Sequence, residues 1–488
     1  MSSPGGNLKS AVAKGFLWGG MSNALCQLLN LFLGIYLARI LGPDDYGPVG
    51  MLAIFSAIAG SLQDSGFVAA LANRKEVTHK DYNAVFWFNV LISVAMYVIL
   101  FASAPLLVDF FNEPSLLWLS RYIFIGFVVA GFGIAPSAYL FRELKVKERS
   151  VATILSIIVS GTVGIALAMN GYSYWGIATQ SILYVLVRSA VYWWFTPWRP
   201  SFRVTFAPLR YLFAFSYRLL VTNIFLRVNW NIFSVILGGN RSYSATDVGN
   251  YTKAAEWMSM GSEVVNGMVN GIAQPVFARV ADDDGRQLHI FRKMLRFTAF
   301  VSFPLLLGLS LVAPEIIVIA ITDKWLESAY MLRILAVWGA FMPIQSMFTN
   351  LLISRGRSVV FMWGTIVQGL LVLMLLVGLA PLGINTMLAA YVIFNVLWLF
   401  VWRYYAGKEV SLTLTMFLRD LLPFASLSAV VMFSAYWFTV SIDNIYMLLF
   451  ARIAIAALLY ILLLALFRCE ELYEAARFLL HKNENQRL

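Results

Sequence analysis

Three charged residues lie inside stretches that are otherwise apolar, and they are the first candidates for chemistry in this chain. Arg227, Glu256 and Glu263 each interrupt hydrophobic sequence. A charge within a membrane span is costly and usually faces a water-filled cavity. An arginine in such a cavity can hold a diphosphate or a sugar acid, because its guanidinium donates several hydrogen bonds in a fixed planar geometry.

Further polar residues recur at helical spacing around these charges. In 248–276 they return every three or four positions and share one helical face, and 210–237 and 15–40 carry similar shorter series. The candidate cavity residues are Arg227, Glu256, Glu263, Lys253, Asn223, Asn231, Asn270, Asn23, Gln27, Asn30, Asp64 and Arg333. Arg227 and Glu256 lie ~15 Å and ~12 Å from the outer ends of their helices and could pair. For any single Asn or Gln, a hydrogen bond that joins two helices is an equally good explanation.

The composition of the chain indicates that these helices lie in a membrane. The 488 residues are 60% hydrophobic and 12% charged, and such a chain cannot bury its apolar surface in water. Stretches of about 20 apolar residues match the ~30 Å hydrocarbon core. The predicted spans are 15–40, 47–71, 84–108, 117–140, 150–170, 174–196, 210–237, 248–276, 297–320, 330–353, 358–379, 385–405, 419–440 and 446–468. We therefore expect an all-α integral membrane protein with about 14 transmembrane helices.

The basic residues set the expected orientation of these spans. With the N-terminus inside, 26 of the 36 Lys and Arg residues fall in cytoplasmic segments and 4 fall outside. This bias follows the positive-inside rule and places both termini in the cytoplasm. It also explains the net charge of +11 without a nucleic-acid partner. Arg188, Arg218 and Arg452 lie within spans but are expected to snorkel to a membrane surface, so they are left out of the site.

Several function classes lack their sequence signatures. The loops are too short for a fused ATPase, and no phosphate-binding Gly-Lys-Ser/Thr loop occurs. The three histidines, His79, His289 and His481, are not spaced as metal ligands and are expected to be solvated. A membrane-embedded glycan-processing enzyme would need a large loop and a catalytic acid or base at the membrane interface, and neither is visible. We expect no enzyme activity, no metal and no cofactor.

An internal repeat divides the chain. Ile40-Leu-Gly-Pro-Asp-Asp45-Tyr-Gly47 is echoed about 200 residues later by Ile236-Leu-Gly and then Asp247-Val-Gly249-Asn-Tyr251. Asp suits a helix N-terminus and Gly suits a tight turn, so two unrelated capped turns are an alternative explanation. The repeat favours two six-helix lobes, 1–197 and 210–406, joined by an interfacial linker at 198–209. Two further helices within 407–468 and a cytoplasmic tail at 469–488 would follow.

Short motifs in this order resemble a known family. The first turn of the repeat, the segment Asp64-Ser-Gly-Phe-Val-Ala-Ala-Leu-Ala-Asn-Arg74, and Gly249-Asn-Tyr251 followed by Gln274-Pro-Val-Phe-Ala-Arg279 resemble Wzx-type O-antigen and colanic-acid flippases. The resemblance covers nearly the whole chain, including the fourteen spans. The chain departs from the family pattern at 240–245 and at 229–231. These departures bear on which substrate is expected, but not on the family.

This resemblance to polysaccharide exporters of the multidrug/oligosaccharidyl-lipid/polysaccharide superfamily implies a function. Such proteins flip undecaprenyl-diphosphate-linked oligosaccharides, such as O-antigen, capsule or exopolysaccharide repeat units, across the bacterial inner membrane by alternating access. The partners implied are this substrate, membrane lipids and a polysaccharide polymerase with other assembly proteins. Arg227 would hold the diphosphate or sugar acids. Glu256 and Glu263 would neutralise it or carry a coupling H⁺ or Na⁺.

Two related functions stay open at this point. A lipid II flippase is close to the first hypothesis and is not distinguished from it by residues alone. A cation-coupled small-molecule or multidrug antiporter of the same superfamily would use an acidic, aromatic cavity without a central arginine. Asp64, Glu256 and Glu263 would supply the acidic groups of such a cavity.

Overall fold

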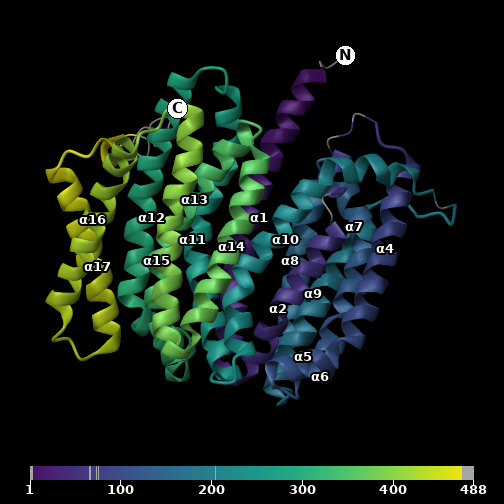
Figure 1. Ribbon diagram of the computed structural model, residues 1–488, viewed down its shortest axis with the longest axis horizontal. Coiled ribbons are helices and arrows are strands. Elements are labelled where there is room, and N and C mark those ends of the chain that lie inside the picture. Colours follow the sequence, from purple (N-terminus) through teal and green to yellow (C-terminus); the bar gives the residue numbers. More distant parts are fainter. Residues whose placement is uncertain are drawn as a thin grey trace. The chain divides into compact units, whose positions relative to one another are not determined.

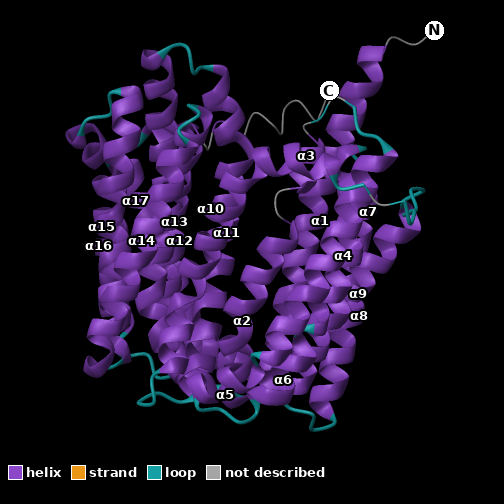
Figure 2. Cartoon of the chain, turned by 45° about the vertical axis from the view of Figure 1, so that its right-hand side comes forward, coloured by secondary structure: helices purple, strands orange, loops and turns teal. Residues whose placement is uncertain are grey.

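A computed structural model describes residues 4–64, 67–72, 74, 76–203, 205–474 and 477, and these residues form helices and loops with no strand. The helices are α1 (Pro4–Ile40), α2 (Pro43–Asp64), α3 (Phe67–Ala72), α4 (His79–Ala102), α5 (Ala104–Phe111), α6 (Leu116–Ile123), α7 (Ile125–Arg142), α8 (Val146–Met169), α9 (Tyr174–Phe195), α10 (Ala207–Gly239), α11 (Ala245–Arg279), α12 (Asp284–Ile321), α13 (Leu326–Ser354), α14 (Ser358–Leu379), α15 (Ile384–Val410), α16 (Leu414–Thr439) and α17 (Ile445–Leu466). Two short 3₁₀ turns, Asp323–Trp325 and Ala380–Leu382, precede α13 and α15. Loops and turns join the helix ends (Figure 2).

The all-α membrane fold expected from the sequence is confirmed. In the described part of the chain, eleven helical segments are long and apolar enough to cross a membrane. The remaining predicted spans coincide with α2 and α3, with α9 and with α11. The total of fourteen crossings stays a prediction, because these last helices do not reach that apolar character.

The chain forms two compact units, residues 1–252 and 253–488. In the first unit, α8 and α9 pack as a hairpin, α1 lies on α8, α7 packs against α4 and α9, and α10 packs against α2 (Figure 1). In the second unit, α12 is central and contacts α13, α16 and α17, and α15 covers α13. The division between the units falls within α11, and the proposed lobes bounded by 198–209 stay a prediction.

The two copies of the sequence repeat adopt the same geometry in the first unit. At the start of α2, the Gly42 backbone N–H donates to the Asp45 carboxylate over 2.9 Å. At the start of α11, the Ser244 backbone N–H donates in the same way to Asp247 over 2.8 Å. Each aspartate is the third residue of its helix and satisfies a backbone donor that the helix leaves unpaired.

These two helix starts also contact each other. A Cβ atom on Gly47 would overlap the backbone carbonyl of Ala245, and a Cβ atom on Gly249 would overlap the carbonyl of Pro43. Between them, the Thr246 hydroxyl donates to Asp44, 202 residues away. Glycine is therefore required at both positions because the two backbones cross without room for a side chain.

The predicted interfacial linker is held on α4. The Ser201 backbone N–H donates to the Asn83 side chain over 2.9 Å, and Trp87 donates from its indole to the Ser201 carbonyl over 2.8 Å. Trp198 is buried and donates to His79 over 3.0 Å. The linker is thus an ordered part of the first unit. His79, expected to be only solvated, takes part in this contact.

Candidate functional site

The polar residues of α10 lie on an exposed face of the first unit. Asn223 and Arg227 are exposed, and the Asn231 side chain donates to the Arg227 backbone carbonyl over 2.8 Å. The Arg227 guanidinium makes no hydrogen bond or ion pair with any described residue. An exposed arginine in the middle of a membrane helix is stable only where water or a counter-anion reaches it.

The same is true of α1. Asn23, Gln27 and Asn30 are exposed, whereas the hydroxyl of Ser22 is buried against that of Ser150 on α8 at 2.7 Å. The predicted helical face is thus present as an exposed polar face. Three amides that face hydrocarbon would leave donors and acceptors unsatisfied, so this face fits a water-filled region.

Lys253 and Glu256 form an ion pair in the second unit. Their side chains meet at 2.7 Å, and Lys253 is almost completely buried, with its ammonium 5.8 Å from the ring centre of Trp325. The expected common polar face of α11 is therefore not uniform: Lys253 points into the protein. The charge of Glu256 is already neutralised within its own helix, and pairing of Arg227 with Glu256 stays a prediction.

Glu263 is the unpaired acid of α11. Its side chain is exposed, and no basic residue in the described part of the chain forms an ion pair with it. A carboxylate at this position can bind and release a cation without first breaking an ion pair. The neighbouring amide Asn270, in contrast, accepts a hydrogen bond from Asn350 on α13 over 2.8 Å. Asn270 therefore joins two helices, as one of the two explanations for such residues predicted.

Arg333 and Asp64 are the two remaining candidates. Arg333 is half-buried on α13, and its backbone carbonyl accepts a hydrogen bond from Ser310 over 2.7 Å. The side chain of Asp64, at the end of α2, lies outside the described residues, as does that of Arg218.

A buried ion pair corrects the expectation for Arg452. This arginine does not snorkel outward: its guanidinium contacts Glu315 of α12 at 2.6 Å, with side-chain exposures of 6% and 8%. It also donates to the Leu311 carbonyl at 3.3 Å and lies over the ring of Tyr436. Sequence alone missed the pair because its members lie 137 residues apart. Its role is to hold α17 against α12.

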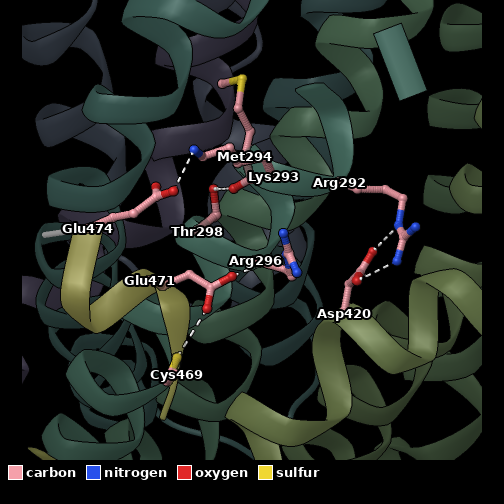
Figure 3. Close-up of polar contacts among 9 residues, drawn as sticks. All are labelled: Arg292, Lys293, Met294, Arg296, Thr298, Asp420, Cys469, Glu471 and Glu474. Carbon is pink, nitrogen blue, oxygen red and sulfur yellow. Dashed lines mark hydrogen bonds and ion pairs between the residues drawn. The ribbon is translucent and has the colours of Figure 1, made fainter. Parts of the chain in front are cut away.

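A cavity of about 490 Å³ lies in the second unit, between the C-terminal half of α11, the N-terminal half of α12 and residues 470–474. Val265, Met268 and Phe297 contribute apolar surface. Ion pairs close one side of the cavity: Lys293 contacts Glu474 at 2.8 Å and Arg296 contacts Glu471 at 3.1 Å (Figure 3). Nearby, Arg292 holds Asp420 of α16 with two hydrogen bonds of 2.6 and 2.9 Å.

The sequence of this chain also matches a known protein family. The model of the family described as "Polysaccharide biosynthesis protein" matches residues 36–330. The chain belongs to this family. The teichuronic acid biosynthesis protein TuaB of Bacillus subtilis is 25% identical over 94% of this chain and 96% of its own length. The lipopolysaccharide biosynthesis protein WzxC of Escherichia coli is 26% identical over 72% of this chain and 71% of its own length.

Solved structures show that the fold is shared more widely than the sequence. The lipid II flippase MurJ in an inward closed conformation matches with a TM-score of 0.73 and 14% identity, covering 92% of this chain and 98% of its own. An inward-facing multidrug resistance transporter of the MATE family, which belongs to the MOP superfamily, matches with a TM-score of 0.64 and 18% identity over 79% of this chain and 94% of its own. The chain is thus a multi-pass membrane protein of the polysaccharide biosynthesis family, and it shares its fold with these flippase and transporter structures.

Proposed function

We propose that this protein flips an undecaprenyl-diphosphate-linked oligosaccharide from the cytoplasmic to the outer leaflet of the bacterial inner membrane. The observation that carries this proposal is Arg227, an exposed guanidinium without a described partner in the middle of a membrane helix. Such a group needs a counter-anion, and a diphosphate or an acidic sugar provides one with matching geometry. The family membership and the names of the relatives TuaB and WzxC support a glycan substrate.

The transport step needs no covalent chemistry. Its difficulty is the passage of a charged, hydrated headgroup through hydrocarbon, while the lipid tail can stay in the bilayer. Exposed amides such as Asn23, Gln27 and Asn223 offer donors and acceptors that replace water around the sugar hydroxyls. Arg227 neutralises the negative charge. Polar faces on α1 and α10 therefore provide the groups that lower the free energy of the crossing headgroup.

We also propose that Glu263 carries the coupling ion, H⁺ or Na⁺. It is the acid of α11 that is exposed and unpaired among the described residues, whereas Glu256 is held by Lys253. Both termini are placed in the cytoplasm on the distribution of basic residues. A polysaccharide polymerase and other assembly proteins are the partners that would use the flipped product.

The test is complementation of a deletion strain, followed by mass spectrometry of extracted lipids. Deletion should remove the surface glycan and accumulate the diphosphate-linked oligosaccharide inside. Arg227→Ala should lower export by about tenfold or more, as expected for loss of a charge-assisted contact. Arg210→Ala, which removes an exposed arginine at the start of the same helix, should complement fully.

Two outcomes would contradict the proposal. An unchanged lipid profile in the deletion strain would exclude the flippase function. It would favour a cation-coupled small-molecule antiporter, for which the unpaired Glu263 would be the main acidic group, and drug susceptibility would then be measured. Full export by Arg227→Ala at normal protein level would exclude the arginine clamp.

A further inference from the structure

Besides Arg227, the first unit contains a second cationic region, and none of the predicted site residues lines it. A cavity of about 490 Å³ lies between α2, α7, α8 and α9, helices that pack together within this unit (Figure 1). Two arginines line it, Arg149 of α8 and Arg188 of α9. Arg149 directly precedes the predicted span 150–170, and Arg188 was expected to snorkel to a membrane surface, so neither is among the predicted site residues.

Neither arginine has a carboxylate partner in the part of the chain that the structure describes. No acid in the described ranges forms an ion pair with either, and each guanidinium instead lies against an aromatic ring. Arg149 lies 4.9 Å from the ring centre of Phe141, and Arg188 lies 5.0 Å from that of Tyr184. The Nε atom of Arg149 is buried without a hydrogen-bond acceptor. The Arg188 guanidinium also donates to the Tyr184 hydroxyl over 3.4 Å. Neither the ring contacts nor this hydroxyl neutralises a positive charge, so two cationic groups line this cavity without an anionic partner among the described residues.

The helix hairpin brings the two charges to the same end of the unit. Arg149 lies three residues after the start of α8 and Arg188 lies seven residues before the end of α9, which corresponds to ~5 Å and ~10 Å along the antiparallel pair. The two helices pack along their length, because Gly164 and Gly176 allow close backbone approach. Two separate elements thus direct cationic groups to one region.

Hydroxyl groups complete the lining. Ser56 of α2, Ser137 of α7 and Ser189 of α9 line the same cavity, and their hydroxyls donate no hydrogen bond to a described residue. On the α2 side, Gly60 leaves open space, because a Cβ atom there would have no neighbour within 4 Å. The cavity therefore combines two charged forks, several hydroxyl donors and an unfilled volume.

We propose that this cavity is a binding site for a phosphate-type anion, either a diphosphate or the phosphate of a lipid headgroup. A phosphate presents more acceptor oxygens than a carboxylate, and it can accept from two guanidinium groups and from hydroxyls at once. A volume of about 490 Å³ is in the range of small-molecule sites. The site lies within one unit and does not include Arg227, so this inference goes beyond the proposed function and does not depend on it.

The test is calorimetric titration of the purified full-length protein in a neutral detergent. The probes are inorganic diphosphate, geranyl diphosphate, geraniol and glucuronate. Wild type should bind at least one diphosphate probe, more tightly than glucuronate and with no binding of geraniol. Binding of both diphosphates indicates a site for the free anion, and binding of geranyl diphosphate alone indicates a lipid-borne one.

Variants locate the binding in the cavity. Arg149→Gln and Arg188→Gln should each raise the Kd about tenfold, as expected for loss of a charge-assisted hydrogen bond. Gly60→Leu should weaken binding while keeping both charges. The matched control is Arg121→Gln, because Arg121 belongs to the same unit and stacks on Phe101 and Trp118 but does not line the cavity.

Several results would overturn the proposal. If wild type binds no diphosphate probe, or if it binds glucuronate more tightly than the diphosphates, either result excludes the site. If Arg121→Gln weakens binding as much as Arg149→Gln and Arg188→Gln do, the effect is one of general charge and not of the site. Unchanged binding in the Arg149→Gln, Arg188→Gln double variant would also exclude it. Absence of diphosphate binding to wild type would count against the Arg227 clamp as well. The Arg149 and Arg188 variants leave Arg227 intact, so their results test this cavity separately from the export test.

Discussion

At the scale of single residues, charges in the membrane region fall into two groups. Arg452 and Lys253 are buried and paired with Glu315 and Glu256, whereas Arg227 is exposed and has no described partner. The Arg452–Glu315 pair joins two helices, the Lys253–Glu256 pair neutralises charge within one helix, and an unpaired accessible charge is available for a ligand. The sequence could mark all of them as unusual, because a charge within an apolar stretch is rare. It could not sort them, because the partner of Arg452 is set by helix packing.

Removal of one member of the buried pair should be costly. Arg452→Ala leaves Glu315 as an uncompensated buried charge, and we expect it to reduce the free energy of unfolding by ~3–5 kcal/mol. The measurement is thermal unfolding in detergent. The double variant Arg452→Leu, Glu315→Leu should recover most of the loss, because two apolar side chains replace the pair without leaving a charge. A double variant as unstable as Arg452→Ala would show that the charge is not the cause.

At the scale of helices, capping and close approach explain how α2 and α11 begin. The aspartates of the repeat were recognisable in the sequence because Asp is favoured in the first turn of a helix. The sequence could not show that Gly47 and Gly249 each face the backbone of the other helix, because a glycine after a turn has many explanations. The contact appears only when the two turns are brought together in space.

Substitution of either glycine should disturb this crossing. Gly47→Val and Gly249→Val force the two backbones apart, and each is expected to destabilise the protein by more than about 1–3 kcal/mol, as for an overpacked core. Gly267→Ala is the matched control within α11, because a Cβ atom there meets nothing within 4 Å. The measurement is the melting temperature of each purified variant. Equal melting temperatures for all three would contradict the close contact.

The contact between the C-terminal segment and α12 should weaken in acid. The hydrogen bond from Lys293 lowers the pKa of Glu474 below its ordinary value of 4.5. Because the folded-state pKa is depressed, the contribution of this contact is present at neutral pH and is lost as the pH falls through that lowered pKa. Hydrogen exchange at residues 470–474 should increase in this acidic range. In Lys293→Gln it should be fast already at neutral pH, and slow exchange in that variant would contradict the prediction.

At the scale of the whole molecule, charge and hydropathy were informative. They predicted an all-helical membrane protein, and the resemblance of short motifs indicated the polysaccharide family to which the chain belongs. They did not predict the internal cavities, because a cavity depends on which faces of several helices meet. Arg149 and Arg188 show this limit: the first precedes a predicted span, the second was expected to snorkel, and only the α8–α9 hairpin places them together.

The expected orientation can be tested by cysteine labelling. With Cys26 and Cys469 replaced by serine, single cysteines at Arg241 and at Arg357 should report opposite sides. An impermeant maleimide added to intact cells should label the first position and reach the second only after permeabilisation. The reverse pattern would overturn the placement of both termini in the cytoplasm.

The crossing of α2 and α11 has a consequence for the history of the chain. Pro43 meets Gly249 and Ala245 meets Gly47, so each patch contacts the counterpart of itself. Such a reciprocal arrangement is what a twofold axis produces in a homodimer. One polypeptide here contains the interface that two identical half-length subunits would form, as expected after gene duplication and fusion. In a saturation library, the substitutions tolerated at Gly47 and at Gly249 should therefore match each other more closely than those at their sequence neighbours.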